Sequence, residues 1–408
     1  MPELVKGNAV VGQSGGPTAV INQSLVGVIE AAKAARVIDK VLGARHGVRG
    51  IKNNDFVDLR TLSDEQLARI ADTPAAALGS TRDKPDPEYC QAIFKSFEAN
   101  QVRYFFYIGG NDSADAARIV NEIARQNRYE LRVFHVPKTI DNDLKVTDHC
   151  PGYGSAARFV ACALMGDDRD NASLPGVKID IIMGRNAGWL TAATALARQA
   201  EGDGPHLIYL PERPVTPDQF CRDVAEVYQR LGRCVVAASE GIIDAADGKL
   251  WAEKVVAGGE VDAHGNKQLS GSGSLGDSLA KLVKTRVAAM LGGKKLRVRA
   301  DTFGYLQRSF AGFASPVDAK EARMCGKKAV DFAMRGHKDG SVAMRRKPGA
   351  PGTAYGVTYF RAELKDVARE TKPLLDEFIA PNGHDVTPAF LGYVRPLAGK
   401  LPVLGRID

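Results

Sequence analysis

The stretch Tyr104-Phe-Phe-Tyr-Ile108-Gly109-Gly110 and the helical pattern that follows it decide the fold class. A short apolar run rich in aromatic residues and ended by glycines predicts a buried strand. Apolar residues then recur at helical spacing through 114–123, which predicts a helix with one apolar face. The stretch is therefore a predicted strand–turn–helix unit, the building block of parallel α/β sheets.

The same unit recurs on both sides of this stretch. Apolar runs at 9–11, 132–136 and 179–183 each lead into a polar turn and a helical pattern, one helix running from about 154 to 165. Near-continuous apolar strands that alternate with helices predict mostly parallel sheets covered on both faces. We therefore expect an α/β fold with ligands bound in the loops after the strands. Later strands are predicted at 206–210, 234–238, 296–300 and 342–344.

Composition bounds the class of protein. The 408 residues are 44% hydrophobic and 25% charged, which excludes a disordered, collagen-like or disulfide-stapled chain and suits two or three domains of ~150 residues. Lys and Arg number 55 against 48 Asp and Glu, a net charge of +7. That excess fits either a nucleic-acid surface or pockets for small phosphorylated ligands, and composition does not choose between them.

Cysteine and histidine spacing bears on compartment and metal. The six cysteines include no C-x-x-C pair and are expected to be free thiols in a reduced compartment. The seven histidines show neither H-x-x-x-H nor H-E-x-x-H spacing, which argues against a zinc site. No apolar run approaches the ~18 residues of a membrane span, and a strand is predicted almost at the N-terminus, so we expect a cytoplasmic protein without membrane association.

Two glycine-containing turns are candidate anion sites. Gln13-Ser-Gly15-Gly16-Pro-Thr follows the first strand and precedes a helix, whose free N–H groups attract negative charge. Gly109-Gly-Asn111-Asp112-Ser repeats the design with groups that repel a bare phosphate unless a cation or a lysine intervenes. The G-x-G-x-x-G match at 271–276 lacks a preceding strand, so we expect the Gly-rich stretch 244–276 to be a lid-like insertion instead of a dinucleotide site.

Thr139-Ile-Asp141-Asn-Asp143, next to Lys138, is the most informative stretch. One of two carboxylates in such a loop can act as a general base while the other orients a group or a hydrated metal. A turn whose side chains cap backbone N–H groups is the alternative. Arginines at strand ends suit bidentate phosphate binding, and a surface ion pair is the alternative for any one of them.

In this order, the motifs resemble the phosphofructokinase family from about residue 8 to 345. The resemblance implies two Rossmann-like three-layer domains with mostly parallel sheets and the active site in the cleft between them. It places a phosphoryl-donor domain at 1–151 plus about 309–355, and a sugar-phosphate domain at 152–308 plus about 356–408. The motifs that carry it are Gly15-Gly16 with Asn22, Leu78-Gly-Ser-Thr-Arg82, Gly109-Gly-x-x-Ser113, Thr139-Ile-Asp-Asn-Asp143, Met183-Gly-Arg185, Glu240 and Gly304-Tyr-Leu-Gln-Arg308.

The resemblance implies phosphoryl transfer to the C1 hydroxyl of fructose 6-phosphate. By position, Asp141 would take the hydroxyl proton, Thr139 would contact the reacting groups and Asp143 would support the site electrostatically. In the family the position of Arg299 often reaches across a subunit interface, which implies a homodimer or homotetramer. The sugar would be held by Met183, Gly184, Arg185 and Glu240, with Arg185 also facing the transferring group, and its 6-phosphate by Arg299, Tyr305 and Arg308.

Two departures from the family's ATP-using pattern concern the phosphoryl donor. Asp112 stands where ATP-using members have glycine, and its carboxylate would crowd and repel an α-phosphate. Lys138 replaces the glycine before Thr139 and adds positive charge suited to a compact donor. This pair resembles the pyrophosphate-dependent members, so we expect inorganic pyrophosphate as donor and a reversible reaction that serves glycolysis and gluconeogenesis. Pyrophosphate would bind at Gly15, Gly16, Arg82 and Lys138, and the expected catalytic residues are Asp141, Asp112, Lys138 and Arg185.

Magnesium is the expected cofactor. Asn111 stands where many relatives have an Asp that helps position Mg²⁺, so Asn111 and Asp143 are the candidate ligands. Three alternatives remain open: an ATP-dependent phosphofructokinase, a non-catalytic ligand-sensing homologue, and a nucleic-acid binder. The last lacks any Lys/Arg block with interleaved aromatic residues, so we expect neither nucleic acid nor membrane as a partner.

Overall fold

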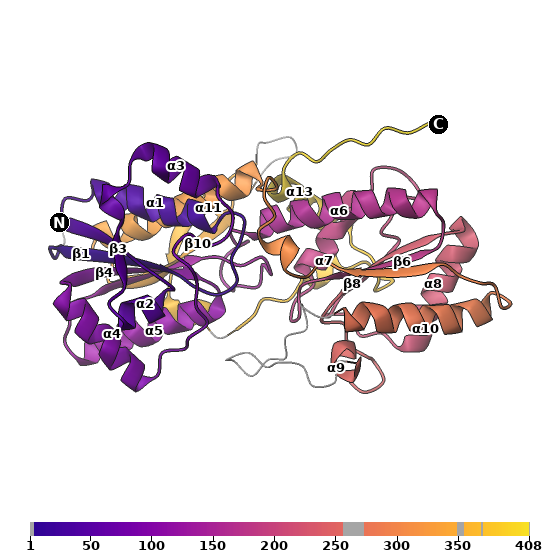
Figure 1. Cartoon of the computed structure of the whole chain (residues 1–408), viewed down its shortest axis with the longest axis horizontal. Coiled ribbons are helices and arrows are strands. Elements are labelled where there is room, and N and C mark those ends of the chain that lie inside the picture. The colour runs from indigo at the N-terminus through magenta and orange to yellow at the C-terminus, as the bar shows by residue number, and fades with distance from the viewer. Residues whose placement is uncertain (1–3, 256–272, 349–354, 369, 408) are drawn as a thin grey trace. The chain divides into compact units, whose positions relative to one another are not determined.

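The computed structural model describes residues 4–255, 273–348, 355–368 and 370–407. The chain divides into two compact units, one made of 1–155 and 308–372 and the other of 156–307 and 373–408. The expected α/β architecture with mostly parallel sheets is confirmed in both units (Figure 1). All six cysteines are free, as expected.

In its described residues the first unit holds a seven-stranded sheet in the order β11-β10-β5-β4-β1-β2-β3. The pairs β10/β5, β5/β4, β4/β1 and β1/β2 are parallel, and the two edge strands β11 and β3 are antiparallel to their neighbours. The strands are β1 (Gly7–Gln13), β2 (Ile38–Ala44), β3 (Phe56–Asp58), β4 (Val102–Gly109), β5 (Arg132–Pro137), β10 (Asp339–Arg346) and β11 (Val357–Ala362).

Helices cover both faces of this sheet because its central strands are apolar on both sides. Along β4, Tyr104, Phe106 and Ile108 face a core shared with α1, α3 and α11, whereas Phe105 and Tyr107 face α2, α4 and α5 (Figure 1). The helices are α1 (Ile21–Ala34), α2 (Val48–Lys52), α3 (Asp64–Asp72), α4 (Pro87–Ala99), α5 (Asn111–Gln126), α11 (Pro316–Met334) and α12 (Leu364–Val367), with a short 3-10 helix at Leu59–Thr61.

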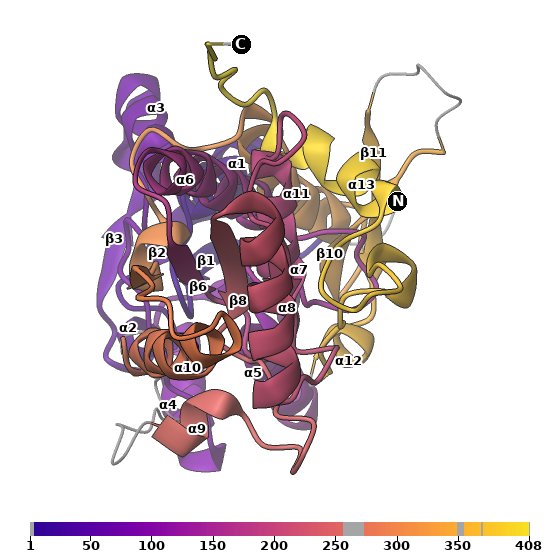
Figure 2. The same cartoon turned by 90° about the vertical axis from the view of Figure 1, so that its right-hand side faces the viewer.

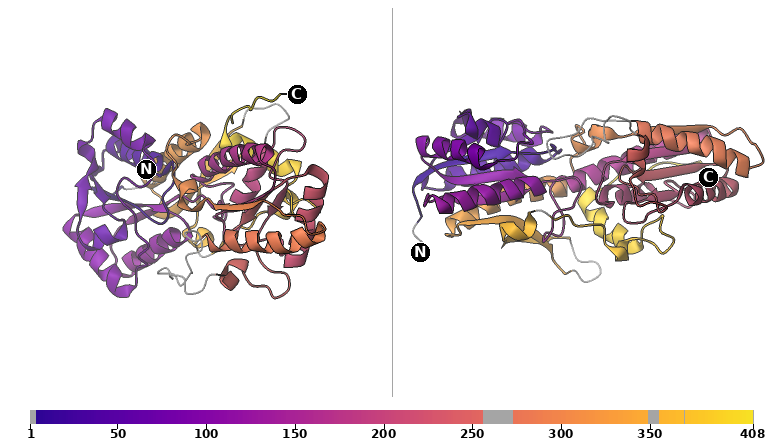
Figure 3. Two further views of the ribbon diagram at one scale, coloured as in Figure 1. Left: turned by 45° about the vertical axis from the view of Figure 1, so that its right-hand side comes forward. Right: turned by 90° about the horizontal axis from the view of Figure 1, so that it is seen from below.

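The second unit is built on a parallel sheet in the order β7-β8-β6-β9, made of β7 (Leu207–Tyr209), β8 (Cys234–Ser239), β6 (Val177–Ile182) and β9 (Val298–Thr302). Helices α8 and α10 pack on one face, and α6 lies on the other (Figures 1 and 2; Figure 3 gives two more views). The helices are α6 (Tyr153–Ser173), α7 (Trp189–Ala193), α8 (Pro217–Leu231), α9 (Trp251–Val255), α10 (Ser274–Met290) and α13 (Pro388–Ala398), with 3-10 helices at Thr194–Ala197, Gly304–Arg308 and Asp376–Phe378.

Local signals explain several helix starts. Ser63 begins α3 with a capping box, because its hydroxyl accepts from the N–H of Gln66 while the Gln66 side chain accepts from the N–H of Ser63. Thr216 caps α8 through its hydroxyl, and Pro217 occupies the first turn, where a missing N–H does no harm.

The structure corrects the expected unit boundaries. Residues 356–372 were expected with the sugar-phosphate domain, but β11 forms an antiparallel pair with β10 and so belongs to the first unit. Arg308 begins the chain's return into that unit instead of ending the second. The segment expected at about 154–165 extends to Ser173, and β6 begins at Val177 and ends one residue before Met183.

The expected lid-like insertion at 244–276 falls largely on 256–272, which lie outside the described residues. Its described parts are a turn at 244–250, helix α9, and the start of α10. Among the helices built from described residues, none combines the length and the hydropathy that crossing a bilayer requires.

Candidate functional site

The carboxyl ends of β1, β4 and β5 lie side by side, and the loops that follow them carry the candidate site residues of the first unit. Backbone hydrogen bonds tie these loops together: the N–H of Ser14 donates to Ile108 at 2.9 Å, and that of Lys138 donates to Gly109 at 2.9 Å. The sequence placed these residues after three strands, and the sheet order makes them neighbours. This edge is therefore where the first unit can bind a ligand.

At the turn of Gly15 and Gly16, cationic side chains approach the backbone closely because neither residue has a side chain. Gly15 adopts φ +74°, a conformation that favours glycine, and its N–H donates to the carbonyl of Thr81 at 3.0 Å. A Cβ at Gly16 would stand 3.0 Å from Cζ of Arg308. The turn thus presents backbone to the same space that a guanidinium group enters, which suits an anion.

Lys138 is the central cation of this group. Its side chain is 3% exposed, and its ammonium group donates to the carbonyl of Gly16 at 2.7 Å. Burial, together with the charges of Arg308 and Arg82, lowers the pKa of Lys138 to about 7, although the carboxylate of Asp141 acts in the opposite direction. Lys138, Arg308 and Arg82 are thus held close together although their positive charges repel one another. Binding of a polyanion would relieve this repulsion.

Asp141 and Asp143 form an interacting carboxylate pair. Burial raises the pKa of Asp141, although Arg308, Lys138 and Arg82 pull it down. Burial and the charge of Asp141 raise the pKa of Asp143 to about 7. A carboxylate pair that shares a proton near neutral pH can accept one from a substrate hydroxyl.

The turn between these carboxylates is held by side chains on either side. Asn142 adopts φ +56°, and its Oδ1 accepts from the N–H of Cys150 at 2.9 Å. The hydroxyl of Thr139 accepts from the N–H of Asp141 at 3.0 Å. Capping of this kind is what the turn alternative predicts, so a capped turn positions the two carboxylates.

Asn111 begins α5 beside the carboxylate pair. Its Nδ2 donates to Oδ2 of Asp143 at 3.2 Å, so the structure brings together the two expected metal ligands. Within the described part of the chain, Oδ1 of Asn111 is buried and has no hydrogen-bond partner. A neutral amide oxygen next to a carboxylate is a donor set that a hard divalent cation accepts.

Asp112 and Arg82 lie at the open side of the group. Asp112 is exposed in the first turn of α5, where a carboxylate is also favoured by the helix dipole. Arg82 is exposed too, and its charge reaches Lys138 and Asp141. Both expected residues therefore border the site from solvent, while Lys138 lies at its floor.

In the second unit, the carboxyl ends of β8, β6 and β9 bring Met183, Gly184 and Glu240 together. The N–H of Glu240 donates to Ile182 at 2.8 Å, and Oε1 of Glu240 accepts from the N–H of Gly184 at 3.4 Å. Glu240 is 6% exposed, so its carboxylate is held against the turn that carries Arg185. Three of the four expected sugar-binding residues thus share one buried corner.

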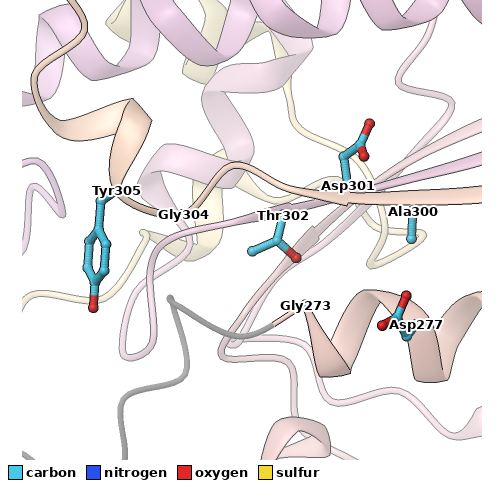
Figure 4. A pocket seen from close by; sticks show the side chains of 7 residues that line it. All are labelled: Gly273, Asp277, Ala300, Asp301, Thr302, Gly304 and Tyr305. Atoms are coloured by element: carbon cyan, nitrogen blue, oxygen red, sulfur yellow. The ribbon is translucent and has the colours of Figure 1, made fainter.

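Arg299 and Tyr305 are exposed on β9 and the 3-10 helix after it. Tyr305 lines a cavity of about 410 Å³ (Figure 4). The figure shows the Asp301 carboxylate on the opposite side of the strand from Ala300 and Thr302. Arg308, which was expected to act together with Arg299 and Tyr305, is assigned to the first unit, where its guanidinium group lies beside Gly16 and Lys138. The cavity is lined by Gly273, Asp277, Ala300, Asp301, Thr302, Gly304 and Tyr305.

An acidic cluster in the second unit was not predicted. Among the described residues, Asp167, Asp180 and Asp301 bring carboxylate oxygens within 4.8 Å of one another. The ammonium group of Lys178 lies among them, 3.3 Å from Asp167 and 3.6 Å from Asp180, and contacts Asp301. Because that ammonium already balances part of the charge, we assign the cluster no metal.

Two residues that position the sites were missed by the sequence reasoning. Oε1 of Gln307 accepts from the N–H of Met183 at 3.3 Å, a role that its place between Tyr305 and Arg308 in the motif could have suggested. Lys372 donates its backbone N–H to the backbone carbonyl of Asp143 at 2.7 Å. No motif surrounds Lys372, and nothing in the sequence signals that contact.

Comparison with known proteins agrees with this geometry. The family model described as phosphofructokinase matches residues 8–333. The pyrophosphate–fructose 6-phosphate 1-phosphotransferase of Rhodospirillum rubrum is 54% identical to this chain, and the alignment covers 97% of this chain and 95% of the relative. The enzyme of the same name from Xanthomonas campestris is 38% identical, and that alignment covers 98% of this chain and 94% of the relative. A crystal structure of a pyrophosphate-dependent phosphofructokinase from Marinobacter aquaeolei superposes with a TM-score of 0.83 at 33% identity, covering 98% of this chain and 94% of that one. The chain belongs to the phosphofructokinase family.

Proposed function

We propose that this chain transfers a phosphoryl group reversibly from inorganic pyrophosphate to the C1 hydroxyl of D-fructose 6-phosphate, giving fructose 1,6-bisphosphate and phosphate. The observation that carries the proposal is the buried Lys138 ammonium group, which donates to Gly16 and whose pKa falls to about 7 beside Arg308 and Arg82. A site that holds this much positive charge in a small space suits a small, highly charged donor.

Asp112 supports the choice of pyrophosphate over ATP. It stands exposed in the first turn of α5, next to Asn111. A nucleotide's α-phosphate at that turn would meet a carboxylate, whereas pyrophosphate ends before it. The relatives named above as pyrophosphate-dependent enzymes favour the same donor.

Asp141 is the proposed general base. The pair that it forms with Asp143 holds its proton near neutral pH, so one carboxylate can accept the C1 hydroxyl proton as the oxygen attacks the phosphorus. Thr139 lies in the same turn and can contact the reacting groups. Asp143 supports the site electrostatically as the second carboxyl group of the pair and takes no proton from the substrate.

Positive groups stabilise the charge that is transferred. Gly15 and Gly16 present the turn, Lys138 lies below it and Arg82 borders it. In loose phosphoryl-transfer transition states such positioning and charge neutralisation supply most of the rate acceleration. Arg185 is the proposed cation that faces both the sugar and the transferring group.

The sugar phosphate is proposed to bind through the second unit's residues. Met183, Gly184 and Glu240 form the buried corner described above, which suits hydroxyl groups. Arg299 and Tyr305 are proposed to hold the 6-phosphate together with Arg308, whose guanidinium group also adds positive charge beside Gly16.

Magnesium is the proposed cofactor, with Asn111 and Asp143 as its protein ligands. The buried Oδ1 of Asn111 and the neighbouring carboxylate of Asp143 fit a hard cation that prefers oxygen ligands. When bound, the ion would neutralise charge on the pyrophosphate oxygens.

We further propose that the protein is a homodimer or homotetramer, since Arg299 and Tyr305 are exposed. We also propose a cytoplasmic location, where the expected substrates occur.

Phosphorus NMR tests the reaction in both directions. Purified protein with Mg²⁺, fructose 6-phosphate and pyrophosphate should consume pyrophosphate and form fructose 1,6-bisphosphate and phosphate in equal amounts. Starting from fructose 1,6-bisphosphate and phosphate, the same mixture should be reached. Pyrophosphate consumed without phosphorylated sugar would indicate a simple pyrophosphatase and contradict the proposal.

A further inference from the structure

His149 lies at the centre of a buried ionic network in the first unit. Its side chain is 2% exposed, Nδ1 lies 2.7 Å from Oδ2 of Asp148, and Nε2 lies 2.7 Å from Oε2 of Glu321. Burial alone would lower the pKa of His149, but the two carboxylates outweigh it and raise that pKa. The imidazolium therefore balances the charge of the buried Glu321 carboxylate and of the partly exposed Asp148 carboxylate.

The partners of His149 come from distant parts of the chain. Glu321 lies on α11, and its Oε1 accepts from the hydroxyl of Tyr355 at 2.8 Å. That hydroxyl also lies 3.3 Å from Nε2 of His149. Arg346, at the end of β10, lies 3.4 Å from Asp148 and covers the ring of Tyr355 at 5.1 Å. The network thus joins a loop residue to α11, to β10 and to the segment before β11.

From His149 the structure leads directly to the carboxylate pair. The next residue, Cys150, donates its N–H to Oδ1 of Asn142, and Asn142 stands between Asp141 and Asp143 at φ +56°. That bond fixes the turn in which both carboxylates lie. The conformation of the pair therefore depends on where the backbone at 149–150 is held.

A second set of bonds holds the loop on the other side of His149. The hydroxyl of Thr147 donates to the carbonyl of His149 at 2.9 Å and accepts from the N–H of Met344 at 3.0 Å. The ammonium group of Lys372 donates to the carbonyls of Thr147 and Asp148 at 3.0 and 2.8 Å. The bond from Thr147 holds the peptide plane that also carries the Cys150 N–H, and the imidazole of His149 anchors the same peptide to Glu321 on α11.

We propose that His149, clamped between Asp148 and Glu321, is a positioning residue for the reaction: it holds the Cys150 N–H against Asn142 and so sets the geometry of Asp141 and Asp143. The inference rests on the proposed function, because it concerns the same carboxylate pair. His149 itself touches no reacting atom. Instead, His149 affects how precisely the carboxylate base is positioned against the substrate hydroxyl. The rate of phosphoryl transfer is sensitive to that positioning.

The test compares His149→Gln with the control His206→Gln. His206 is half-buried in the second unit, where Nδ1 accepts from the N–H of Val235 and Nε2 lies 3.2 Å from Gly202, so its loss also removes two histidine contacts. We expect His149→Gln to lower kcat about 10- to 100-fold while the KM values for both substrates change less than about threefold. The control should keep wild-type kcat.

A second variant keeps the inference falsifiable if His149→Gln fails to fold. Tyr355→Phe removes only the hydroxyl that bonds Glu321 and should lower kcat in the same direction by a smaller factor, again without a matching change in KM. A loss confined to KM, or kcat equal to the control's in a folded His149 variant, would overturn the inference.

Amide hydrogen exchange separates this inference from the proposed function. The peptide that spans residues 139–152 should exchange faster in His149→Gln than in wild type or in His206→Gln, whatever the activity. Equal protection of that peptide in all three proteins overturns the inference. Absence of pyrophosphate-dependent turnover in the wild type overturns the proposed function alone.

Discussion

Replacing Lys138 by methionine should stabilise the empty protein and weaken its binding of pyrophosphate. The pKa of Lys138 falls from 10.5 to about 7. Each unit of pKa corresponds to about 1.4 kcal/mol, so keeping the ammonium group charged in the empty site disfavours folding by on the order of 5 kcal/mol. Loss of the bond to Gly16 leaves a partly buried carbonyl without this donor and offsets about 1–3 kcal/mol of the gain.

The net gain of Lys138→Met is therefore about 2–4 kcal/mol in the free energy of unfolding near neutral pH. Its pH dependence has a definite sign. Below about pH 7 the wild-type lysine is charged in both the folded and the unfolded chain, so the full penalty applies. Between about pH 7 and 10.5 the folded protein loses the proton first, the penalty shrinks, and the advantage of the variant should shrink with it.

Urea unfolding at pH 6.5 and pH 9 measures this difference, and a thermal-shift titration with pyrophosphate measures binding. Removal of a charge-assisted bond of about 1.5–3 kcal/mol should weaken pyrophosphate binding by about 10- to 150-fold. Lys145→Met is the matched control, because Lys145 lies nearby in a surface ion pair with Glu370 and should change stability by less than about 0.5 kcal/mol. The proposed cost of burying the Lys138 charge would be contradicted if the Lys138→Met protein were less stable than wild type at pH 6.5. It would also be contradicted if the stability gain of the variant grew with pH.

Three further variants test other parts of the site. Asp141→Asn should lower kcat by about 10²- to 10⁴-fold in a coupled aldolase assay without lowering stability, because a neutral amide escapes the burial penalty; retained turnover contradicts its role as base. Asn111→Asp should tighten Mg²⁺ binding in calorimetry while destabilising the metal-free protein through repulsion from Asp143; unchanged affinity argues against the ligand assignment. Asp112→Gly combined with Lys138→Gly should shift the ratio of kcat/KM values towards ATP, and an unshifted ratio counts against both roles.

Features encoded within one strand–turn–helix unit were predictable from the sequence. The run Tyr104–Ile108 is β4 in the structure, and Asn111 and Asp112 open the helix after it. The order of the strands then brings the turn after β4 beside the turn that contains Asp141. Both the turn signals and the apolar runs are local, so no distant contact was needed to find them.

Features that depend on pairing between distant segments were not predictable. Strand β2 and the edge strand β11 were not predicted because neither is apolar along its whole length: Asp39 and Lys40 in β2 are exposed, and most of β11 is only partly buried. Since β11 pairs with β10, the expected unit boundary was wrong. The contact of Lys372 with Asp143 and that of His149 with Glu321 join residues far apart in sequence, and neither has a local signal.

The choice of phosphoryl donor is the central claim, and steady-state kinetics of the wild-type protein test it most directly. Fructose 1,6-bisphosphate formation is followed at saturating fructose 6-phosphate and Mg²⁺, with pyrophosphate or ATP as the varied donor. We expect a kcat/KM for pyrophosphate that exceeds that for ATP by at least about 100-fold, the effect of roughly 3 kcal/mol between a paired and a repelled phosphate. Equal values, or turnover with ATP alone, would contradict it.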